Sequence, residues 1–495
     1  MVIPTPLLIM LSPIVVFLVG FLGEELKVKN LREAAAVVAS AASVAAVYML
    51  YLMVEAAPDG ILVFYLQALP PLGACFEIDM LGVFIALSIA LLTFFATLYS
   101  VRYMEHDTRL TEFYALLSAM SVGMIGVAFA GDFFTLFVFW ELMCISSYVL
   151  VAFRKEMWGP IEAGFKYLVM SALGATIIFL AMAFLYGMAG TVNFAQLSNA
   201  LHGQPMSMWL YIVFGLLVVG FGIKAAIVPM HTWLPDAHPE APSPISAMLS
   251  GMLIETGLYG LCRILFLVYE PPAFGAAIAA LSILTMCFAN LLALLQPDIK
   301  RLLAYSSIAQ MGYMLVGLSA GSAYGMLGLT AHIFNHSLMK GLAFLSSGSL
   351  IHMTGTREIE KMKGVGRMMP VTTFTMFVAL LGLGGVPTTN GFISKFILFS
   401  SALGAGMWWL TVIGVINSAF SMAYYLRVLK ILVSAPEEDG SKVTEAPLLM
   451  VAVTAAMAAL IILFGVYPAP VISLADGASK ALVNGLGKYI GAVLP

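Results

Sequence analysis

The chain has 495 residues, of which 61% are hydrophobic and only 10% are charged, and its mean hydropathy is +1.00. A soluble protein of this length needs a charged surface that so few ionisable residues cannot supply, so these values exclude a soluble globular fold. The formal net charge of −3 carries little information, because in a membrane the position of each charge matters more than the sum.

Apolar stretches of about 20 residues recur along the chain, and each is long enough to cross a bilayer core of ~30 Å. The first stretch, Ile3 to Leu22, lacks a basic leader and a small-residue cleavage site, so we interpret it as a helix and not as a signal peptide. Hydropathy predicts an all-α polytopic membrane protein with about 14 transmembrane helices, at 3–22, 33–54, 80–101, 111–130, 132–153, 161–187, 208–228, 243–268, 273–295, 298–319, 325–351, 370–400, 406–433 and 447–468.

Basic residues alternate between the loops of this series. Basic residues follow the first, third, fifth, ninth and eleventh spans. In that order of loops they are Lys27, Lys29 and Arg32; Arg102 and Arg109; Arg154 and Lys155; Lys300 and Arg301; and Arg357, Lys361, Lys363 and Arg367. The loops after the even-numbered spans, from the second to the twelfth, contain no Lys or Arg. The positive-inside rule then predicts cytoplasmic odd-numbered loops, outward-facing termini and a multi-pass protein of the cell (inner or plasma) membrane.

The sequence also suggests an internal repeat. SYVLVAF (147–153) resembles GYMLVGL (312–318), and the interruption of one span at Pro229 has a counterpart in GGVPTTNG (384–391). We predict two five-helix repeats, the fourth to eighth and the ninth to thirteenth helices, which are inverted because their offset is odd, with the seventh and twelfth helices broken. The corresponding domains are 1–110 (three N-terminal helices), 111–268 (first repeat), 269–433 (second repeat) and 434–495 (the last helix and tail).

The ionisable residues that we place within the membrane are Glu141, Lys166, Lys224, Glu255, Arg263, His332, His336, Lys340, Lys395 and Arg427. Each charge costs about 2.5–3.5 kcal/mol at a helix centre, so such residues are expected to face the bundle interior and to form pairs. For Arg427, near a helix end, snorkelling or structural pairing is the preferred interpretation. Structural and functional interpretations of Lys166 and Arg263 are equally open. The mid-span positions of Glu141, Lys224 and Lys395 favour a functional role.

His332, His336 and Lys340 are spaced by four residues and therefore lie along one stripe of a helix. Imidazole titrates near neutral pH, so the stripe is suited to passing protons. A structural histidine that hydrogen-bonds a neighbouring helix is the alternative. A metal site is disfavoured, because no glutamate lies between the histidines and no cysteine is nearby.

Pro229 follows Lys224 closely and removes a helical hydrogen bond, which can leave polar backbone and water beside the ammonium group. A lysine there can gain and lose a proton as a carboxylate approaches or leaves. Because a short loop joins the two spans, we expect Glu255, in the next span, to lie near Lys224. The four cysteines (Cys75, Cys144, Cys262 and Cys287) are far apart and form no C-x-x-C motif, so we expect no cofactor and no metal site.

Five segments together resemble the antiporter-like subunits of respiratory complex I, of Mrp-type cation/proton antiporters and of energy-converting membrane-bound hydrogenases. They are FWELMCISSYVLVAFR (139–154), GIKAAIVPMHTWLPDAHPEAPSPISA (222–247), KRLLAYSSIAQMGYML (300–315), HIFNHSLMKGLAFLSSGSLIH (332–352) and GVPTTNGFISKF (385–396). The resemblance covers nearly the whole chain. It implies the 14-helix inverted-repeat fold, and the subunits most similar are those of the D/N type.

Carried over by position, the resemblance makes Glu141 and Lys224 the coupled pair, His332 the connecting group and Lys395 the terminal lysine of ion translocation. Lys166, His336 and Lys340 are supporting candidates. Glu255 departs from the family, which commonly has lysine there. Either Glu255 is a second counter-ion in a relay from Lys224 to His332, or coupling is altered in this chain.

The expected function is that of a proton- or sodium-translocating subunit of a redox-driven membrane complex, with lipid and other membrane subunits as partners and no nucleic acid. The chain itself is expected to carry out no electron transfer. One alternative is a D-like subunit of an Mrp-type antiporter without a redox module. A solute permease and a structural module that has lost translocation are the others.

Overall fold

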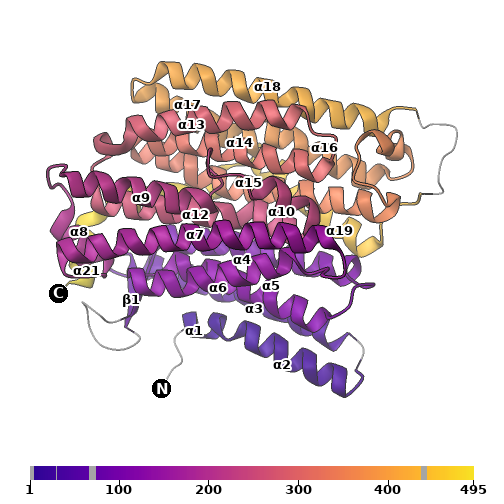
Figure 1. Ribbon diagram of the computed structural model, residues 1–495, viewed down its shortest axis with the longest axis horizontal. Helices are drawn as coiled ribbons and strands as arrows, with labels where there is room; N and C mark the ends of the chain where they lie inside the picture. Colours follow the sequence, from indigo (N-terminus) through magenta and orange to yellow (C-terminus); the bar gives the residue numbers. More distant parts are fainter. Residues whose placement is uncertain (1–4, 29, 66–73, 436–442, 495) are drawn as a thin grey trace.

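The chain folds into a bundle of long helices that run side by side (Figure 1). The computed structural model describes residues 5–28, 30–65, 74–435 and 443–494; Ile3 and Lys29, which enter the sequence predictions, lie outside them. In the described residues, eleven helices are long and apolar enough to cross a membrane, or twelve if the bent pair Glu360–Arg367 and Pro370–Gly384 is one span. The chain is therefore a helical membrane-type protein, and the number 14 stays a prediction.

The elements up to the first interrupted helix are α1 (Thr5–Met10), α2 (Ser12–Glu25), α3 (Leu31–Ala56), β1 (Ile61–Tyr65), β2 (Cys75–Asp79), α4 (Met80–Tyr103), α5 (Leu110–Phe129), α6 (Phe133–Val151), α7 (Trp158–Ala189), α8 (Phe194–Leu201) and α9 (Met208–Lys224). The strands β1 and β2 form an antiparallel hairpin in which Ile61 is opposite Asp79. This hairpin and α8 were not predicted from hydropathy, because short elements outside the apolar stretches give no such signal.

The later elements are α10 (Leu234–Glu240), α11 (Ser243–Met248), the π-helical turn Leu249–Leu253, α12 (Ile254–Val268), α13 (Pro271–Leu294), α14 (Ile299–Ala320), α15 (Ala323–Thr354), the 3-10 turns Glu360–Met362 and Val365–Arg367, α16 (Pro370–Gly384), α17 (Asn390–Gly404), α18 (Trp408–Val433), α19 (Leu448–Val466), α20 (Ala469–Val483) and α21 (Leu486–Val493). Each predicted span coincides with a helix or with two helices separated by a short break. The helices α20 and α21 lie in the segment predicted only as a tail.

Two long helices are interrupted where proline and glycine predict it. The helix α9 ends at Lys224, and the chain resumes a regular helix only at Leu234, with Pro229 between them. The helix α16 ends at Gly384, and Gly385 adopts a φ of 79°, which favours glycine and terminates the helix before α17 begins. Both breaks free backbone carbonyl groups inside the bundle.

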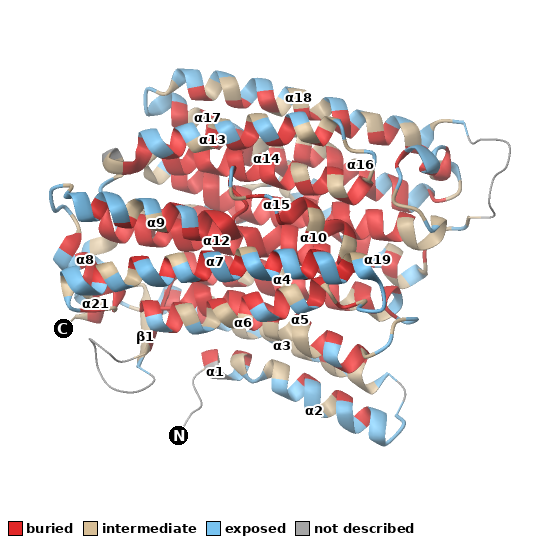
Figure 2. Ribbon diagram, in the orientation of Figure 1, coloured by how far each residue is buried: buried red, intermediate tan, exposed pale blue. Residues whose placement is uncertain are grey.

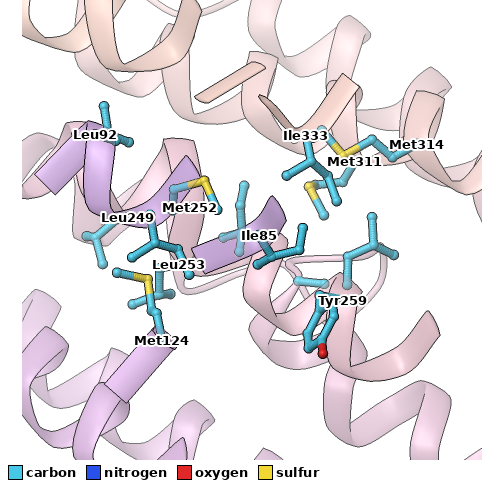
Figure 3. Packing of buried hydrophobic residues seen from close by; sticks show 14 of the residues in the cluster. Ile85, Leu92, Met124, Leu249, Met252, Leu253, Tyr259, Met311, Met314 and Ile333 are labelled. Atoms are coloured by element: carbon cyan, nitrogen blue, oxygen red, sulfur yellow. The ribbon is translucent and has the colours of Figure 1, made fainter. Parts of the chain in front are cut away.

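The most buried elements lie at the centre of the bundle (Figure 2). In α15 every residue from Gly325 to Leu350 is buried, and the membrane-length window of Ser243–Val268 is 100% buried, against 22% for Leu31–Ala56. The central side chains are mainly leucine, isoleucine and methionine from α4, the π-helical turn, α14 and α15 (Figure 3). The polar stripe of α15 therefore lies inside a largely apolar core.

The basic loops meet at one end of the bundle. Arg154, after α6, forms an ion pair of 2.8 Å with Asp107, after α4, so these two loops are in contact. Arg357, after α15, pairs at 3.4 Å with Asp298, after α13, so the second two loops are also in contact. The elements β1, α8 and α21 lie at the opposite end, on the left in Figure 1. This arrangement agrees with the alternation of basic residues along the sequence.

Candidate functional site: a buried row of ionisable side chains

Lys224, the last residue of α9, is buried beside the first helix break. Its Nζ donates a hydrogen bond of 2.6 Å to the Tyr167 hydroxyl and lies 4.7 Å from the centre of the Tyr167 ring. Trp233 stacks on that ring, with centroids 4.1 Å apart, and its indole N–H donates at 2.7 Å to the Ile223 carbonyl, which also accepts from the Ala226 N–H. The break is thus stabilised by aromatic packing that also orients the lysine.

Glu141 is half-buried on α6 and does not form the direct ion pair with Lys224 that the sequence analysis expects. The two side chains interact electrostatically, but none of the ion pairs within 4.0 Å among the described residues contains Glu141. Glu141 lies on the outward face of α6, between Val138 and Ile145, both 47% exposed. The nearest polar group to the ammonium is instead the hydroxyl of Tyr167, so the predicted pair is separated in this state.

Glu255 contacts His336 of α15, Oε1 to Nδ1, and both side chains are fully buried. The expected proximity of Glu255 to Lys224 is wrong as regards direct contact. The reason is helical geometry, because Gly257, two residues and about 200° further round α12, is the position that packs against the backbone of Lys224. The carboxylate therefore points toward α15 and away from α9.

His332 bridges three helices through both ring nitrogens. Its Nδ1 lies 2.8 Å from the Ser394 hydroxyl of α17. Its Nε2 lies 3.1 Å from Oε1, the side-chain amide oxygen of Gln310 on α14. The rings of His332 and His336 are stacked at 6.0 Å. Because Ser394 precedes Lys395 in the chain, His332 connects the His336 region to the second helix break.

Lys340 lies two helical turns beyond His332 on the same stripe and is fully buried. Its Nζ donates to the Leu303 carbonyl at 2.9 Å and to the Ser306 hydroxyl at 2.6 Å. Ser306 in turn hydrogen-bonds the hydroxyl of Tyr425. The amine therefore has polar partners but no carboxylate.

Lys395 is buried in α17, immediately beyond the second break. Its Nζ donates to the Leu383 carbonyl, freed by the end of α16, at 2.6 Å, and to the Ser418 hydroxyl at 3.0 Å. It also lies 4.6 Å from the centre of the Tyr313 ring. A lysine at each break thus uses a nearby aromatic ring and neutral oxygens in place of a carboxylate.

The prediction that Lys166 supports the relay does not agree with its position in the structure. Its side chain is 49% exposed and forms ion pairs with Glu162 at 2.8 Å and with Asp236 at 3.1 Å. Asp236 also pairs with Arg301 in the basic-loop end of the bundle. The start of α7 lies at that end, so Lys166 belongs to a surface ion-pair network and not to the buried row.

The two arginines have structural partners. Arg263 is buried and forms an ion pair with Asp79, the residue that caps α4 by accepting from Gly82 N–H at 2.8 Å. Arg427 donates to the Leu294 carbonyl at 3.1 Å, close to a helix end. The pairing interpretation of both residues agrees with these contacts.

Several site residues were not identified from sequence, namely Tyr167, Gln310, Ser306, Ser394 and Ser418, which hold the ionisable groups in place. Polar residues within apolar helices, such as YSSIAQ at 305–310, are the signal that could have found some of them. His238 was also missed. It is fully buried against Phe344, and neither ring nitrogen has a hydrogen-bond partner.

A second polar cluster lies outside the spans, under α21. The carboxylate of Glu77 accepts hydrogen bonds from the Tyr489 hydroxyl and from Asn193 Nδ2, the latter at 2.9 Å. Burial raises the pKa of Glu77 to about 7, although these hydrogen bonds oppose the shift. No three His, Cys, Asp or Glu side chains among the described residues are placed to hold a metal ion.

Together these features define a multi-pass membrane protein with ionisable groups buried between two broken helices. The family model for the transmembrane region of NADH:quinone oxidoreductase and Mrp antiporters matches residues 130–421, and that for the N-terminus of complex I chain 5 matches 71–114. The chain belongs to this NADH:quinone oxidoreductase/Mrp antiporter family, which confirms the resemblance noted from its motifs.

Similar proteins of known sequence are subunits of redox complexes. F(420)H(2) dehydrogenase subunit N of Methanosarcina mazei is 32% identical over 82% of this chain and 85% of its own length. NADH-quinone oxidoreductase subunit N of Trichlorobacter lovleyi is 35% identical over 82% of this chain and 84% of its own length.

Solved structures of two kinds share the fold. A chain of the membrane-bound sulfane sulfur reductase, an archaeal respiratory membrane complex, is 28% identical, with a TM-score of 0.88 and 99% of both chains covered. A chain of the Mrp complex from Dietzia is 22% identical, with a TM-score of 0.89 over 99% of both chains, and that likeness concerns the fold alone.

Proposed function

We propose that the chain is a proton- or sodium-translocating antiporter-like subunit of a redox-driven membrane complex related to complex I, such as a membrane-bound hydrogenase or a quinone or sulfur reductase. The observation that carries the proposal is the buried row of Lys224, Glu255–His336, Lys340 and Lys395. Charges inside a membrane protein are costly and are retained where they move ions. Membership of the family supports the same function.

The parent complex supplies the driving reaction, and this subunit supplies the ion path. The named relatives are subunits of F(420)H(2) dehydrogenase and NADH-quinone oxidoreductase, which favours a redox partner. The alternative is a D-like subunit of a multisubunit Mrp-type antiporter with no redox module, which the fold likeness also permits. Purification of the native complex separates the two, because redox subunits co-purify only in the first case.

We also propose a helix count, an internal repeat and a membrane orientation for the fold. The two breaks, after Lys224 and after Gly384, correspond to the broken seventh and twelfth helices of a 14-helix bundle with inverted repeats at 111–268 and 269–433. With the basic loops cytoplasmic, both termini lie outside a cell (inner or plasma) membrane. Fusion of a reporter to each terminus tests the orientation.

The proposed mechanism depends on the separation of Glu141 from Lys224 at the first break. Lys224 is held by the Tyr167 hydroxyl, and Glu141 is close enough to interact electrostatically without contact. Approach of Glu141 favours the charged ammonium, and withdrawal favours release of its proton to the row. His332, hydrogen-bonded to the residue that precedes Lys395, then connects the row to the second break.

The test is ion translocation by the assembled complex in sealed membrane vesicles, driven by its redox substrate. Lys224→Ala should lower translocation per complex roughly tenfold or more, the equivalent of about 1.4 kcal/mol in the transfer barrier. A protonophore collapses the gradient if the ion is H⁺, and a sodium ionophore collapses it if the ion is Na⁺. Undiminished translocation by Lys224→Ala complexes would refute the proposed function.

A further inference from the structure

A surface cavity of ≈460 Å³ lies at the end of the bundle that carries β1 and α21. Exposed Glu55 and Lys488 stand on its rim, and buried Asp79 and Arg263 line it further in. Its walls come from α3, α4, α12, α20 and α21. The cavity therefore connects the surface opposite the basic loops with the buried end of α12.

Arg263 lines this cavity and has hydrogen-bond donors without a partner among the described residues. Its side chain is 4% exposed, one terminal nitrogen pairs with Asp79, and the Nε and Nη2 atoms have no partner within the described protein. Buried donors are nearly always hydrogen-bonded, so water that enters beside Arg263 would find two unused donors there.

Two residues of α12, Tyr259 and Glu255, lie between Arg263 and the rest of the buried row. Glu255, Tyr259 and Arg263 are four residues apart, so they lie on one side of the helix and succeed one another at about 6 Å along its axis. The Tyr259 hydroxyl donates to the Ala128 carbonyl at 2.8 Å and points away from the apolar cluster on which its ring packs (Figure 3). At the inner end, Glu255 Oε2 and His336 Nε2 also lack partners.

The same column continues toward the basic end of the bundle. From His336 it passes one helical turn along α15 to Lys340, which hydrogen-bonds α14. The first turn of α14 carries Lys300, a buried lysine that donates to the Ala241 carbonyl at 2.6 Å. Ionisable groups therefore succeed one another from one end of the bundle to the other, along α15 and then along α12.

We propose that this cavity, with the Arg263–Asp79 pair at its floor, is the outward end (the exit) of a proton branch that leaves the buried row at Glu255–His336 and passes Tyr259, separate from the connection through His332 to Lys395. The inference rests on the proposed function. A proton released by the Glu255–His336 pair moves to water, the Tyr259 oxygen accepts it and releases its own proton outward, and the tyrosine ends unchanged. Arg263 stays protonated and paired with Asp79, so it positions water at the cavity floor and does not itself carry the proton.

Filling the cavity tests the exit. Gly477 lines it, and a Cβ added there meets only Met80, at 3.5 Å, so Gly477→Trp can project into the cavity without a clash at its base. Gly487 on α21 has nothing within 4 Å of an added Cβ and does not line the cavity, so Gly487→Trp is the matched control. Gly477→Trp should lower proton translocation per assembled complex several-fold, and Gly487→Trp should match the wild type.

A tyrosine pair tests the inner part of the route. Tyr259→Phe and Tyr269→Phe each remove one buried hydroxyl that donates to a backbone carbonyl, at 2.8 and 2.9 Å, so their structural costs are comparable. Only Tyr259→Phe should lower translocation per complex. Equal behaviour of the two variants would overturn the route.

The outcomes separate this inference from the proposed function. If Lys224→Ala stops translocation while Gly477→Trp and Tyr259→Phe translocate normally, the exit is wrong and the function stands. If Lys224→Ala complexes also translocate normally, the function itself fails. A Gly477→Trp variant that loses complex content, with normal translocation by the complexes that remain, also overturns the exit, because the cavity then holds a partner subunit.

Discussion

The carboxylate of Glu255 and the imidazole of His336 meet inside the bundle, each with 0% of its side chain exposed. The pair joins α12 to α15 and stands between Lys340 and His332 on the stripe of α15. Glu255 is therefore a partner of the histidine stripe and lies at the centre of the row, not at its Lys224 end.

Glu255→Gln should lower translocation per complex roughly tenfold, about 1.4 kcal/mol, and leave assembly near normal. The amide keeps the size and a hydrogen bond to His336 but cannot exchange a proton or balance an imidazolium. Complex content on native gels and translocation in vesicles are both measured. Wild-type translocation by Glu255→Gln would show that the pair is only structural.

Glu141→Ala should abolish or severely reduce translocation while assembly stays largely intact. Lys224 loses the carboxylate whose field favours its charged form, and its hydrogen bond to Tyr167 remains. Glu112→Ala, which removes an exposed carboxylate on α5, is the control and should behave as the wild type. If the two variants translocate equally, the Glu141–Lys224 mechanism is wrong.

Lys395→Ala should block transfer at the second break. The Leu383 carbonyl and the Ser418 hydroxyl would each lose one hydrogen bond but keep another, from Gln310 Nε2 and to the Gly384 carbonyl, so the cost in folding stability is about 0.5–1.5 kcal/mol for each bond and some loss of assembly is also expected. Translocation is therefore normalised to complex content. Reduced content with full translocation per complex would assign Lys395 a structural role.

Lys166→Ala should leave translocation per complex within about twofold of the wild type, because exposed ion pairs contribute little. The side chain is 49% exposed and pairs with Glu162 and Asp236 outside the buried row. The same vesicle measurement applies. A loss as large as that of Glu141→Ala would return Lys166 to the relay.

Glu77 should make stability depend on pH. Its pKa rises from 4.5 to about 7 on folding, so between these values the folded state binds more protons than the unfolded state, and stability falls as pH rises through this window. Thermal unfolding in detergent from pH 4.5 to 7.5 measures the effect. In Glu77→Gln the amide oxygen can still accept hydrogen bonds from Tyr489 and Asn193, but the side chain no longer titrates, so the plot of stability against pH should become flatter. An unchanged slope of that plot would exclude Glu77 as the source of the pH dependence.

The sequence by itself determined the helical membrane class, the positions of the long helices and the two interruptions. These follow from local physics, because apolar length sets a membrane helix and Pro229 or Gly385 ends one whatever packs around it. It also identified Lys224 and Lys395 as the buried lysines beside the breaks. Mid-span ionisable residues are conspicuous against an apolar background.

Only the tertiary structure decided which groups meet. Sequence spacing placed Glu255 near Lys224, but a contact depends on the direction of a side chain around its helix, and two residues of rotation turned Glu255 to His336. Lys166 fell inside an apolar stretch, yet packing left it at the surface with Asp236. Partners such as Tyr167 come from other helices, because in a bundle neighbours in space are set by helix packing and not by order along the chain.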